Sequence, residues 1–311
     1  MNRLQRGIVP LVLLAVFALS PLVLKQYALI LLTNTFMYII LAVSWSMFSG
    51  PTGYISLAPA AFFGAGVYTS AVLGFALPFP LIVITGGLAS FCMAFLVGAL
   101  TLRLRGIYFV MFTFGLVELL LNFVLWWEVT VTGTTGRVVP PLGNTTVFYF
   151  MLAILACLLL TAFRLKHSKY GFALQSIGQG EEAAAHTGIH VTALKMNTFA
   201  LSAFFMGAAG VVMATRWTYI DPRIAFNPTL SFLPVLMAIF GGLGQLYGPI
   251  IGAAIFTYLE EFLITRFPYH YMLIFGITMV IAIRYLPDGL VGLVQKAWKQ
   301  WSRRKHGAAQ G

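Results

Sequence analysis

The sequence predicts an all-α membrane protein, a polytopic bundle of about ten transmembrane helices with both termini in the cytoplasm. Hydrophobic residues make up 60% of the 311 residues and charged residues only 9%, whereas a soluble domain carries about 25% charged residues. The apolar residues fall into long runs, and the basic residues gather in alternate connections between these runs. Because side chains that face lipid must also be apolar, a bundle of membrane helices requires this composition.

The predicted spans follow from the lengths of the apolar runs. A spanning helix needs about 20 residues, because each residue rises 1.5 Å and the hydrocarbon layer is roughly 30 Å thick. In chain order the runs are Ile8–Leu24, Tyr27–Phe48, Tyr54–Leu77, Phe79–Thr101, Ile107–Trp127, Val147–Phe163, Met196–Thr215, Thr229–Ile264 and Phe267–Leu286.

The run Thr229–Ile264 decides the topology. As one helix it would be about 54 Å long, which is too long for a single untilted span. Glycine and proline interrupt it at Gly241, Gly242, Gly244, Gly248 and Pro249, and residues of these types at such density break a helix. We therefore predict two short spans or a re-entrant hairpin here.

The basic residues support this division. With the amino terminus inside, 14 of the 19 Lys and Arg residues fall in cytoplasmic segments and five in outer segments, as the positive-inside rule expects. A single span at Thr229–Ile264 would place the basic tail, residues 287–311, outside. The prediction is one transmembrane domain over residues 1–311, with ten crossings and a cytoplasmic loop at residues 164–195.

The first run has a second interpretation. Arg3 and Arg6 followed by the apolar stretch Ile8–Leu19 could form a secretory signal peptide, although no Ala-x-Ala cleavage site follows.

Several function classes lack their residues in this sequence. The net charge of +11 is distributed at the ends of apolar runs, so we expect no nucleic-acid partner. His186 and His190 are four residues apart without further ligands nearby, so no metal site is expected. The chain has no nucleophile–base pattern, and no Gly-x-x-x-x-Gly-Lys-[Ser/Thr] loop to bind ATP. We predict a protein that is not an enzyme and holds no cofactor.

The loop at residues 164–195 is the longest polar stretch between spans. Glu181 and Glu182 open an alanine-rich segment that Gly188 ends, and this pattern favours a short helix. On these residues alone, the helix could be a solvated connection or a docking element for another subunit.

Glu182, Ala183 and Ala184, followed after three residues by Gly188, resemble the Glu-Ala-Ala motif of bacterial ABC importer permeases. The Leu-Pro pair that ends the general motif is missing, which is similar to the branched-chain amino acid permeases. In that subclass the motif's glutamate aligns with Glu181, so either glutamate could be the main coupling residue. The resemblance implies a cytoplasmic coupling helix that docks on an ATPase through Glu181, Glu182, Ala184 and Gly188.

Further blocks resemble the same family over most of residues 30–260. They are Gly53–Tyr68, the outer-loop stretch Thr132–Gly136, and the late glycine-rich segment Gly241–Gly252. The chain departs from the family pattern at Ala58 and Pro59, and again at Gly178 and Gly180, where the family is often charged or polar. The last two positions put the details of the ATPase contact in question.

The resemblance also implies partners and a substrate. We expect a second homologous permease subunit, two cytoplasmic ATPase subunits that bind the ATP, a periplasmic binding protein and the lipid bilayer of the bacterial inner membrane. Branched-chain or related hydrophobic amino acids are the first expected substrates, and urea, short amides or another small solute are alternatives. An ion-coupled secondary transporter is a different possibility, but it would require more intramembrane carboxylates than this chain has.

The glycine-rich segment has two interpretations. Gly244, Gly248 and Gly252 repeat every four residues, a spacing that lets membrane helices pack closely. Together with Gly241, Gly242 and Pro249, they could instead open backbone groups toward a substrate path.

Polar residues inside the spans are candidates for the translocation pathway. Glu118 lies in mid-span, where burial costs about 2.5–3.5 kcal/mol, so we expect it to face the bundle interior or a cavity. Its role could be in the pathway or the subunit interface, or in a structural hydrogen-bond network. Asn122 lies one turn further on the same face. Asn34 and Tyr38 form a second pair, and Tyr54 and Ser56 lie where the third predicted span begins.

Overall fold

The computed structural model describes residues 17–217, 219–243, 245–285 and 289–292. Over these residues the chain is α-helical apart from two short strands, a π-helical turn and the connections, which confirms the all-α class. Seven helical segments within the described ranges are long and apolar enough to cross a membrane. The predicted total of ten crossings and the positions of the termini stay predictions.

The elements have the following bounds in chain order: α2 Gln26–Thr52, α3 Pro59–Leu73, α4 Phe79–Thr101, α5 Ile107–Trp127, η1 Glu128–Thr132, β1 Arg137–Val138, α6 Asn144–Lys166, α7 Lys169–Gln179, α8 Glu181–His186, α9 Val191–Ala214, β2 Tyr219–Ile220, α10 Pro222–Ala225, α11 Thr229–Gly241, α12 Tyr247–Arg266 and α13 Tyr271–Tyr285. The predicted spans at α4 and α5 have the same bounds as the helices. Most of the first predicted span lies outside the described residues, and its end, residues 17–23, is helical.

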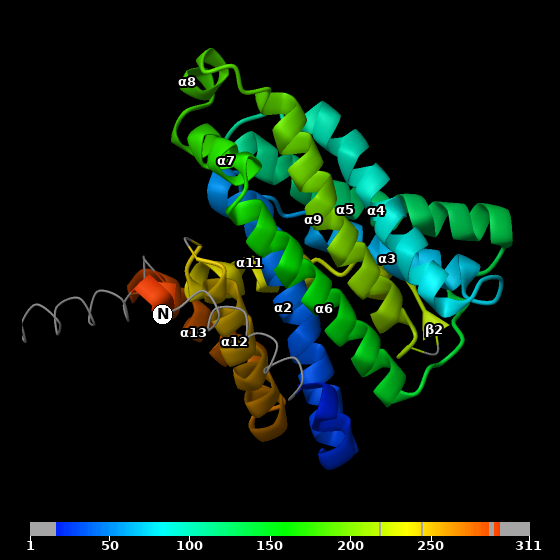
Figure 1. The fold of residues 1–311 in the computed structure, drawn as a ribbon. Coiled ribbons are helices and arrows are strands. Elements are labelled where there is room, and N and C mark those ends of the chain that lie inside the picture. The colour runs from blue at the N-terminus through cyan, green and yellow to red at the C-terminus, as the bar shows by residue number, and fades with distance from the viewer. Residues whose placement is uncertain (1–16, 218, 244, 286–288, 293–311) are drawn as a thin grey trace, which may run out of the picture.

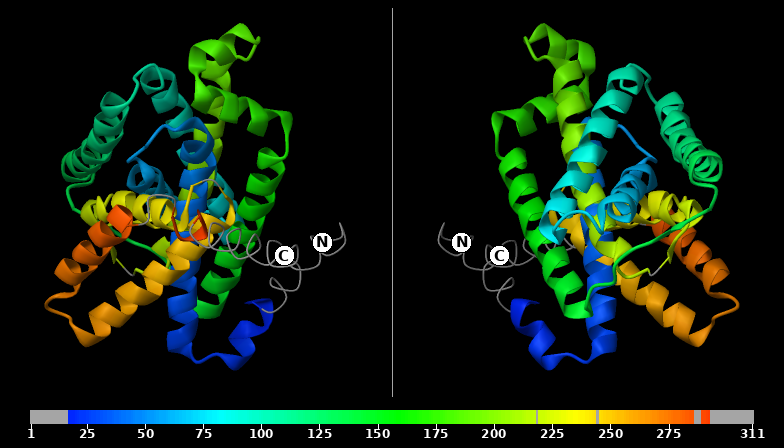
Figure 2. Two further views of the ribbon diagram at one scale, coloured as in Figure 1. Left: turned by 90° about the vertical axis from the view of Figure 1, so that its left-hand side faces the viewer. Right: turned by 90° about the vertical axis from the view of Figure 1, so that its right-hand side faces the viewer.

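The helices pack around α9 and α2 (Figure 1). α9 packs against α3 and α4, whereas α2 packs against α6, α9 and α12. α12 and α13 form a hairpin at the edge of the bundle (Figure 2). α9 runs from α8 at one end of the molecule to β2 at the other, where β2 pairs antiparallel with β1.

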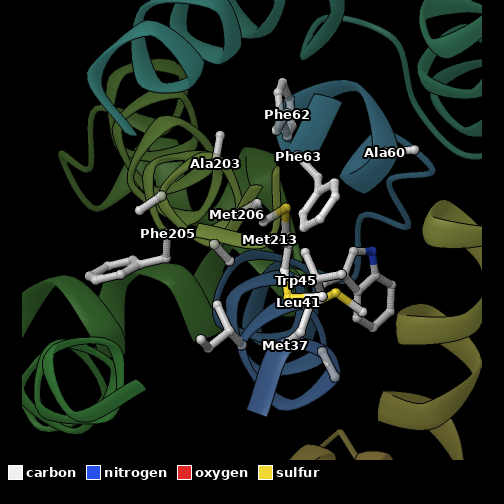
Figure 3. Packing of buried hydrophobic residues seen from close by; sticks show 14 of the residues in the cluster. Met37, Leu41, Trp45, Ala60, Phe62, Phe63, Ala203, Phe205, Met206 and Met213 are labelled. Atoms are coloured by element: carbon white, nitrogen blue, oxygen red, sulfur yellow. The ribbon is translucent and has the colours of Figure 1, made fainter. Parts of the chain in front are cut away.

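Buried side chains of α2, α3 and α9 form the centre of the core (Figure 3). Leu41 and Trp45 of α2 lie near Phe63 of α3 and Met206 of α9, and each of these side chains is at most 2% exposed. The backbones of α3 and α9 approach so closely at Gly66 and Gly207 that a Cβ atom on Gly66 would overlap the carbonyl of Gly207. Small residues permit this approach, as in other membrane helix pairs.

The third predicted span, Tyr54–Leu77, is wrong in its bounds. α3 has only 15 residues and is therefore about 22 Å long, short of the roughly 30 Å hydrocarbon layer. Residues 53–58 before it are irregular, beginning with Gly53 at φ 73° and ending before Pro59 at the start of the helix. Hydropathy could not predict this because every residue of the segment except Ser56 and Tyr54 is apolar or glycine.

Side chains from other helices satisfy the backbone of this irregular segment. Trp45 Nε1 donates to the carbonyl of Ser56 at 2.7 Å, and the Leu57 N–H donates to Thr113 Oγ1 at 2.9 Å. The Ala60 N–H, in the first turn of α3, donates to Ser231 Oγ at 3.1 Å. Non-helical backbone is tolerated at membrane depth only where protein groups or water replace the missing hydrogen bonds.

The division of Thr229–Ile264 agrees with the structure. α11 ends at Gly241 and α12 begins at Tyr247. Between them Gly242 has a φ of 108°, a conformation that glycine adopts readily and other residues rarely do. The break therefore lies within the predicted glycine-rich segment.

Candidate functional site

The loop at residues 164–195 is folded against the bundle. Ser168 caps α7, accepting a hydrogen bond from the Gly171 N–H at 3.3 Å. Leu174 and Ile177 are buried on the face of α7 that packs against the bundle. α8 follows, and Gly188 has a φ of 84° in the turn that leads into α9. The segment is a pair of short helices fixed at one end of the molecule, as Figure 1 shows for α7 and α8.

The two adjacent glutamates of α8 point to different surroundings. The side chain of Glu181 is 17% exposed, whereas that of Glu182 is 86% exposed. Ala184 is buried, so it packs α8 against the rest of the chain. Among the four predicted coupling residues, Glu182 is the one whose side chain is open to a partner, and Gly188 permits the turn that follows.

Glu181 forms the centre of a polar network. Its Oε1 accepts hydrogen bonds from Lys195 Nζ at 2.5 Å and from Tyr54 Oη at 2.7 Å. Its Oε2 lies 3.1 Å from Arg105 Nη2. Lys195 Nζ also donates to Tyr54 Oη at 3.1 Å and to the carbonyl of Leu102 at 3.0 Å. The network brings together α8, α9, the turn before α3 and the connection between α4 and α5.

The network keeps Glu181 ionised. Burial alone acts to raise the pKa of the Glu181 carboxyl, but the hydrogen bonds from Lys195 and Tyr54 and the charges of Lys195 and Arg105 outweigh it. The pKa of Glu181 therefore lies below its ordinary value. Burial, together with the hydrogen bond to Glu181, raises the pKa of the Tyr54 phenol, which remains a donor at neutral pH.

Sequence reasoning missed Lys195 and Arg105 as members of this site. The distribution of basic residues assigns both to predicted cytoplasmic segments and gives neither a contact with Glu181. Lys195 is 14 residues beyond Glu181, across the α8–α9 turn, so no helical spacing connects the two positions. The available signal was a lysine inside the first turns of an apolar helix, where a charge needs a partner.

Tyr54 and Ser56, predicted for the pathway, lie in the irregular segment before α3. Tyr54 contacts Glu181 and so lies at the end of the bundle that carries α8. Ser56 is 3% exposed. A space that holds about one water molecule lies beside it, lined also by Ser49 and Ser202.

Asn34 and Tyr38 lie on the face of α2 that turns toward α9 and α12. Asn34 Oδ1 accepts a hydrogen bond from Arg216 Nη1 at 2.6 Å, just beyond the end of α9. Tyr38 is partly buried and packs against the hydrophobic core. Tyr27, further out on α2, donates to Glu261 Oε1 at 2.6 Å. The two candidates are therefore held in contacts between helices of this chain.

The expectation that Glu118 faces the interior of this bundle or a cavity within it is wrong. Glu118 and Asn122 are both exposed on α5, and the Asn122 amide donates only to the carbonyl of Glu118, at 2.8 Å. α5 together with η1 is the least buried of the seven spanning segments described: only 17% of its most apolar stretch is buried. The rest of the bundle covers the opposite face, which carries Phe109, Thr113 and Val117.

The glycine-rich break packs two helices closely. A Cβ on Gly241 would overlap the carbonyl of Gly248, and one on Gly252 would overlap the carbonyl of Met237. Pro249 is buried in the first turn of α12. Gly244 lies outside the described residues. A cavity of about 440 Å³ separates this break from α7, with Ser46, Gly50, Leu174, Gln175 and Leu246 in its wall.

One acidic residue that sequence reasoning overlooked is fully buried. Glu128, in η1 directly after α5, has no exposed surface and accepts a hydrogen bond from the Gly136 N–H at 2.8 Å. The sequence signal for this contact is the Thr132–Gly136 stretch. Its last residue, eight positions after Glu128, donates its N–H to the carboxylate. The part of the chain that the structure covers has no group of three or more His, Cys, Asp or Glu side chains able to hold a metal ion.

Comparison with known proteins finds relatives that are named as permease proteins. The chain is 26% identical to the high-affinity branched-chain amino acid transport system permease protein LivM of Salmonella typhimurium, over 96% of this chain and 77% of that protein. It is 28% identical to LivM of Escherichia coli, over 97% and 78%. The ribose import permease protein RbsC of Haemophilus influenzae is 26% identical over 41% of each chain. No solved structure matches.

A family model described as branched-chain amino acid transport system / permease component matches residues 27–283. The match runs from the start of α2 into α13 and includes α8 and the Glu181 network. With its spanning helices, the chain is a multi-pass inner-membrane transport subunit and not an enzyme. It belongs to the family of permease components of branched-chain amino acid transport systems.

Proposed function

We propose that this chain is one of two membrane-spanning subunits of an ATP-driven importer that carries branched-chain or related hydrophobic amino acids across the bacterial inner membrane. A periplasmic binding protein delivers the solute, and two cytoplasmic ATPase subunits supply the energy. The family match and the names of the two relatives that align with nearly the whole of this chain support the substrate class. Both termini lie in the cytoplasm in this proposal.

The observation that carries the proposal is the geometry of α8. A six-residue helix is fixed at the end of the bundle by the Glu181 network, while Glu182 is 86% exposed. A rigid helix with an open acidic side chain is suited to docking in a groove of another subunit. Movement of that subunit would then reach the membrane helices as a rigid-body displacement.

The basic residues near α8 support a cytoplasmic position for this end. Arg103 and Arg105 lie in the connection that contacts α8 through Glu181. Arg164 and Lys166 end α6 just before α7. Cytoplasmic connections of membrane proteins are enriched in such residues.

The exposed polar face of α5 is the proposed contact with the second permease subunit. Glu118 and Asn122 lie in the middle of a span, and a carboxylate facing lipid at that depth would cost about 2.5–3.5 kcal/mol. A partner protein, or a water-filled path between the two subunits, removes that cost. Asn34, Tyr38 and Ser56 remain pathway candidates with contacts inside this chain.

Reconstitution into proteoliposomes tests the function. The chain is combined with a homologous permease, the two ATPase subunits and the binding protein, and uptake of labelled leucine, isoleucine and valine is measured with and without ATP. We expect uptake only with ATP and binding protein. Parallel assays with urea, a short amide and ribose test the other solute classes.

Two outcomes would contradict the proposal. Uptake by this chain alone, driven by a proton or sodium gradient, would make it a secondary transporter. ATP-driven uptake of urea or ribose with no uptake of branched-chain amino acids would keep the importer class and overturn the substrate.

A further inference from the structure

We propose that Glu181 transmits movement of α8 to the membrane helices and that Glu182 makes the contact with the ATPase subunit. This inference rests on the proposed importer function and divides the two glutamates into different tasks. Glu181 is a positioning residue in this proposal because it acts through Lys195, Tyr54 and Arg105.

The first support is the orientation of the two side chains. Successive residues of an α-helix point about 100° apart, so adjacent residues on a short helix can face the protein and the solvent. The side chain of Glu181 lies inside the polar network and is 17% exposed, whereas the side chain of Glu182 points outward and is 86% exposed. Arg105 Nη1 is 3.8 Å from Glu182 Oε1, but both of these side chains are largely exposed. Glu182 can therefore exchange this contact for one with a partner.

The second support is the complete use of the Lys195 ammonium group. An ammonium group has three N–H donors, and Lys195 directs them to Glu181, Tyr54 and the carbonyl of Leu102. Its side chain is 3% exposed, and its Nζ lies 4.5 Å from the centre of the Tyr54 ring. A buried cation with all its donors occupied holds its neighbours in one arrangement. Removing Glu181 leaves that cation without its counter-charge.

The third support is the set of segments that meet at this point. Glu181 begins α8, and Lys195 lies in the second turn of α9. Leu102 ends α4, Arg105 precedes α5, and Tyr54 belongs to the turn between α2 and α3. α9 packs along α3 and α4 through the whole core. A displacement of α8 therefore pulls on the helices that form the centre of the bundle.

The test compares variants at the two neighbouring positions in the reconstituted complex. The variant Glu181→Gln keeps the size of the side chain and removes its charge, and Glu182→Gln is its matched counterpart on the exposed side. Three quantities are measured: retention of the ATPase subunits during purification, the rate of ATP hydrolysis, and the number of solutes transported per ATP.

We expect Glu181→Gln to retain the ATPase subunits and to lower the number of solutes per ATP by between about twofold and thirtyfold, the range for residues that modulate coupling between sites. We expect Glu182→Gln to weaken retention of the ATPase subunits and to lower hydrolysis and transport together, with solutes per ATP unchanged. Loss of the ATPase subunits from Glu181→Gln, or wild-type solutes per ATP in that variant, would overturn the proposal.

Three further measurements cover a variant that folds poorly or a complex that does not transport. Tyr54→Phe removes one hydroxyl and keeps the ring, and it should lower solutes per ATP in the same direction. Lys195→Met combined with Glu181→Gln should lower solutes per ATP no more than either single variant does, because both changes remove the same contact.

Amide hydrogen exchange of α8 in the isolated chain should increase in Glu181→Gln and not in Glu182→Gln. If the wild-type complex shows no ATP-driven uptake, the importer function fails. Equal hydrogen exchange of α8 in these two variants would instead contradict the proposed role of Glu181 in holding α8.

Discussion

Glu128 Oε1 lies 3.4 Å from Arg137 Nε, across the loop that joins α5 to β1. The carboxylate is fully buried, and its other oxygen accepts the Gly136 N–H. Arg137 extends over the ring of Trp127 at 5.0 Å. At 3.4 Å the contact between the two charges is an ion pair without good hydrogen-bond geometry. The pair closes the loop between α5 and β1 against the end of α5.

The first prediction concerns the stability of this loop. Glu128→Ala should lower the free energy of unfolding by about 1–3 kcal/mol, because it removes the acceptor for Gly136 and leaves Arg137 without its counter-charge. The effect stays below that of a fully buried pair because Arg137 keeps a quarter of its surface exposed. Denaturant titration of the purified chain in detergent measures it.

Glu118→Ala is the matched control for that experiment. It removes a carboxylate from α5, the helix directly before η1, but Glu118 is exposed and makes no side-chain ion pair in the part of the chain described. We expect it to cause no loss of stability in the isolated chain, because it removes a mid-span carboxylate that is exposed there. Equal losses in the two variants would show that the Glu128–Arg137 pair adds nothing specific.

The second prediction concerns the exposed face of α5. In a background with Cys92 and Cys157 replaced by alanine, an Asn122→Cys variant labelled with a maleimide that carries a photoreactive group should cross-link on illumination to the second permease subunit in the assembled complex. A cysteine at Leu96 of α4, which is 67% exposed, should face lipid and give no such product. Gel electrophoresis with subunit-specific detection separates the outcomes. Cross-linking from Leu96 alone would place the partner on another face.

The sequence predicts continuous helices well in this chain and predicts interrupted ones less well. α4 and α5 have the expected bounds because each is an unbroken apolar run between a Pro or Gly and a charged or polar segment. The start of α3 could not be placed, since the hydrogen bonds that release residues 53–58 from helical geometry come from Trp45 and Thr113 on other helices. Hydropathy contains no information about these contacts.

The candidate site shows the same division. The sequence indicated a short helix at Glu181–Gly188 because its local composition determines it. It did not indicate that Glu181 turns inward, since its partners lie on distant segments. For Glu118 the sequence argument required cover by protein or water, but it could not distinguish cover within this chain from cover by another subunit.

The third prediction concerns the close approach of α3 and α9. Gly66→Ala should destabilise the chain by about 1–3 kcal/mol, because its Cβ would overlap backbone atoms of Gly207 that cannot turn aside. Gly115→Ala on α5 is the control, since nothing lies within 4 Å of the Cβ it would add. There the change should be neutral or slightly stabilising, as alanine favours helix over glycine by up to about 1 kcal/mol. Denaturant titration of both variants measures the difference, and comparable stabilities would contradict the packing.

The fourth prediction concerns the pH dependence of the Glu181 network. Because Lys195, Tyr54 and Arg105 hold the pKa of Glu181 below its ordinary value of 4.5, the ionised carboxylate stabilises the folded chain at every pH above that value. The contribution is lost as pH falls through the lowered folded-state pKa. Tyr54 does not interfere, because its raised pKa keeps it protonated across this range.

The measurement compares thermal unfolding of the wild type and Glu181→Gln in detergent as pH is lowered from neutral. The difference between the two unfolding midpoints should stay constant down to about pH 5 and then shrink below the ordinary pKa of glutamate. Protonation makes the Glu181 side chain of the wild type neutral, as the glutamine of the variant is at every pH. A difference that disappears between about pH 5 and pH 8 would mean that burial dominates and that the pKa of Glu181 is raised instead. In that case Glu181 would be neutral at neutral pH, and its contact with Lys195 could not hold α8 through an ion pair.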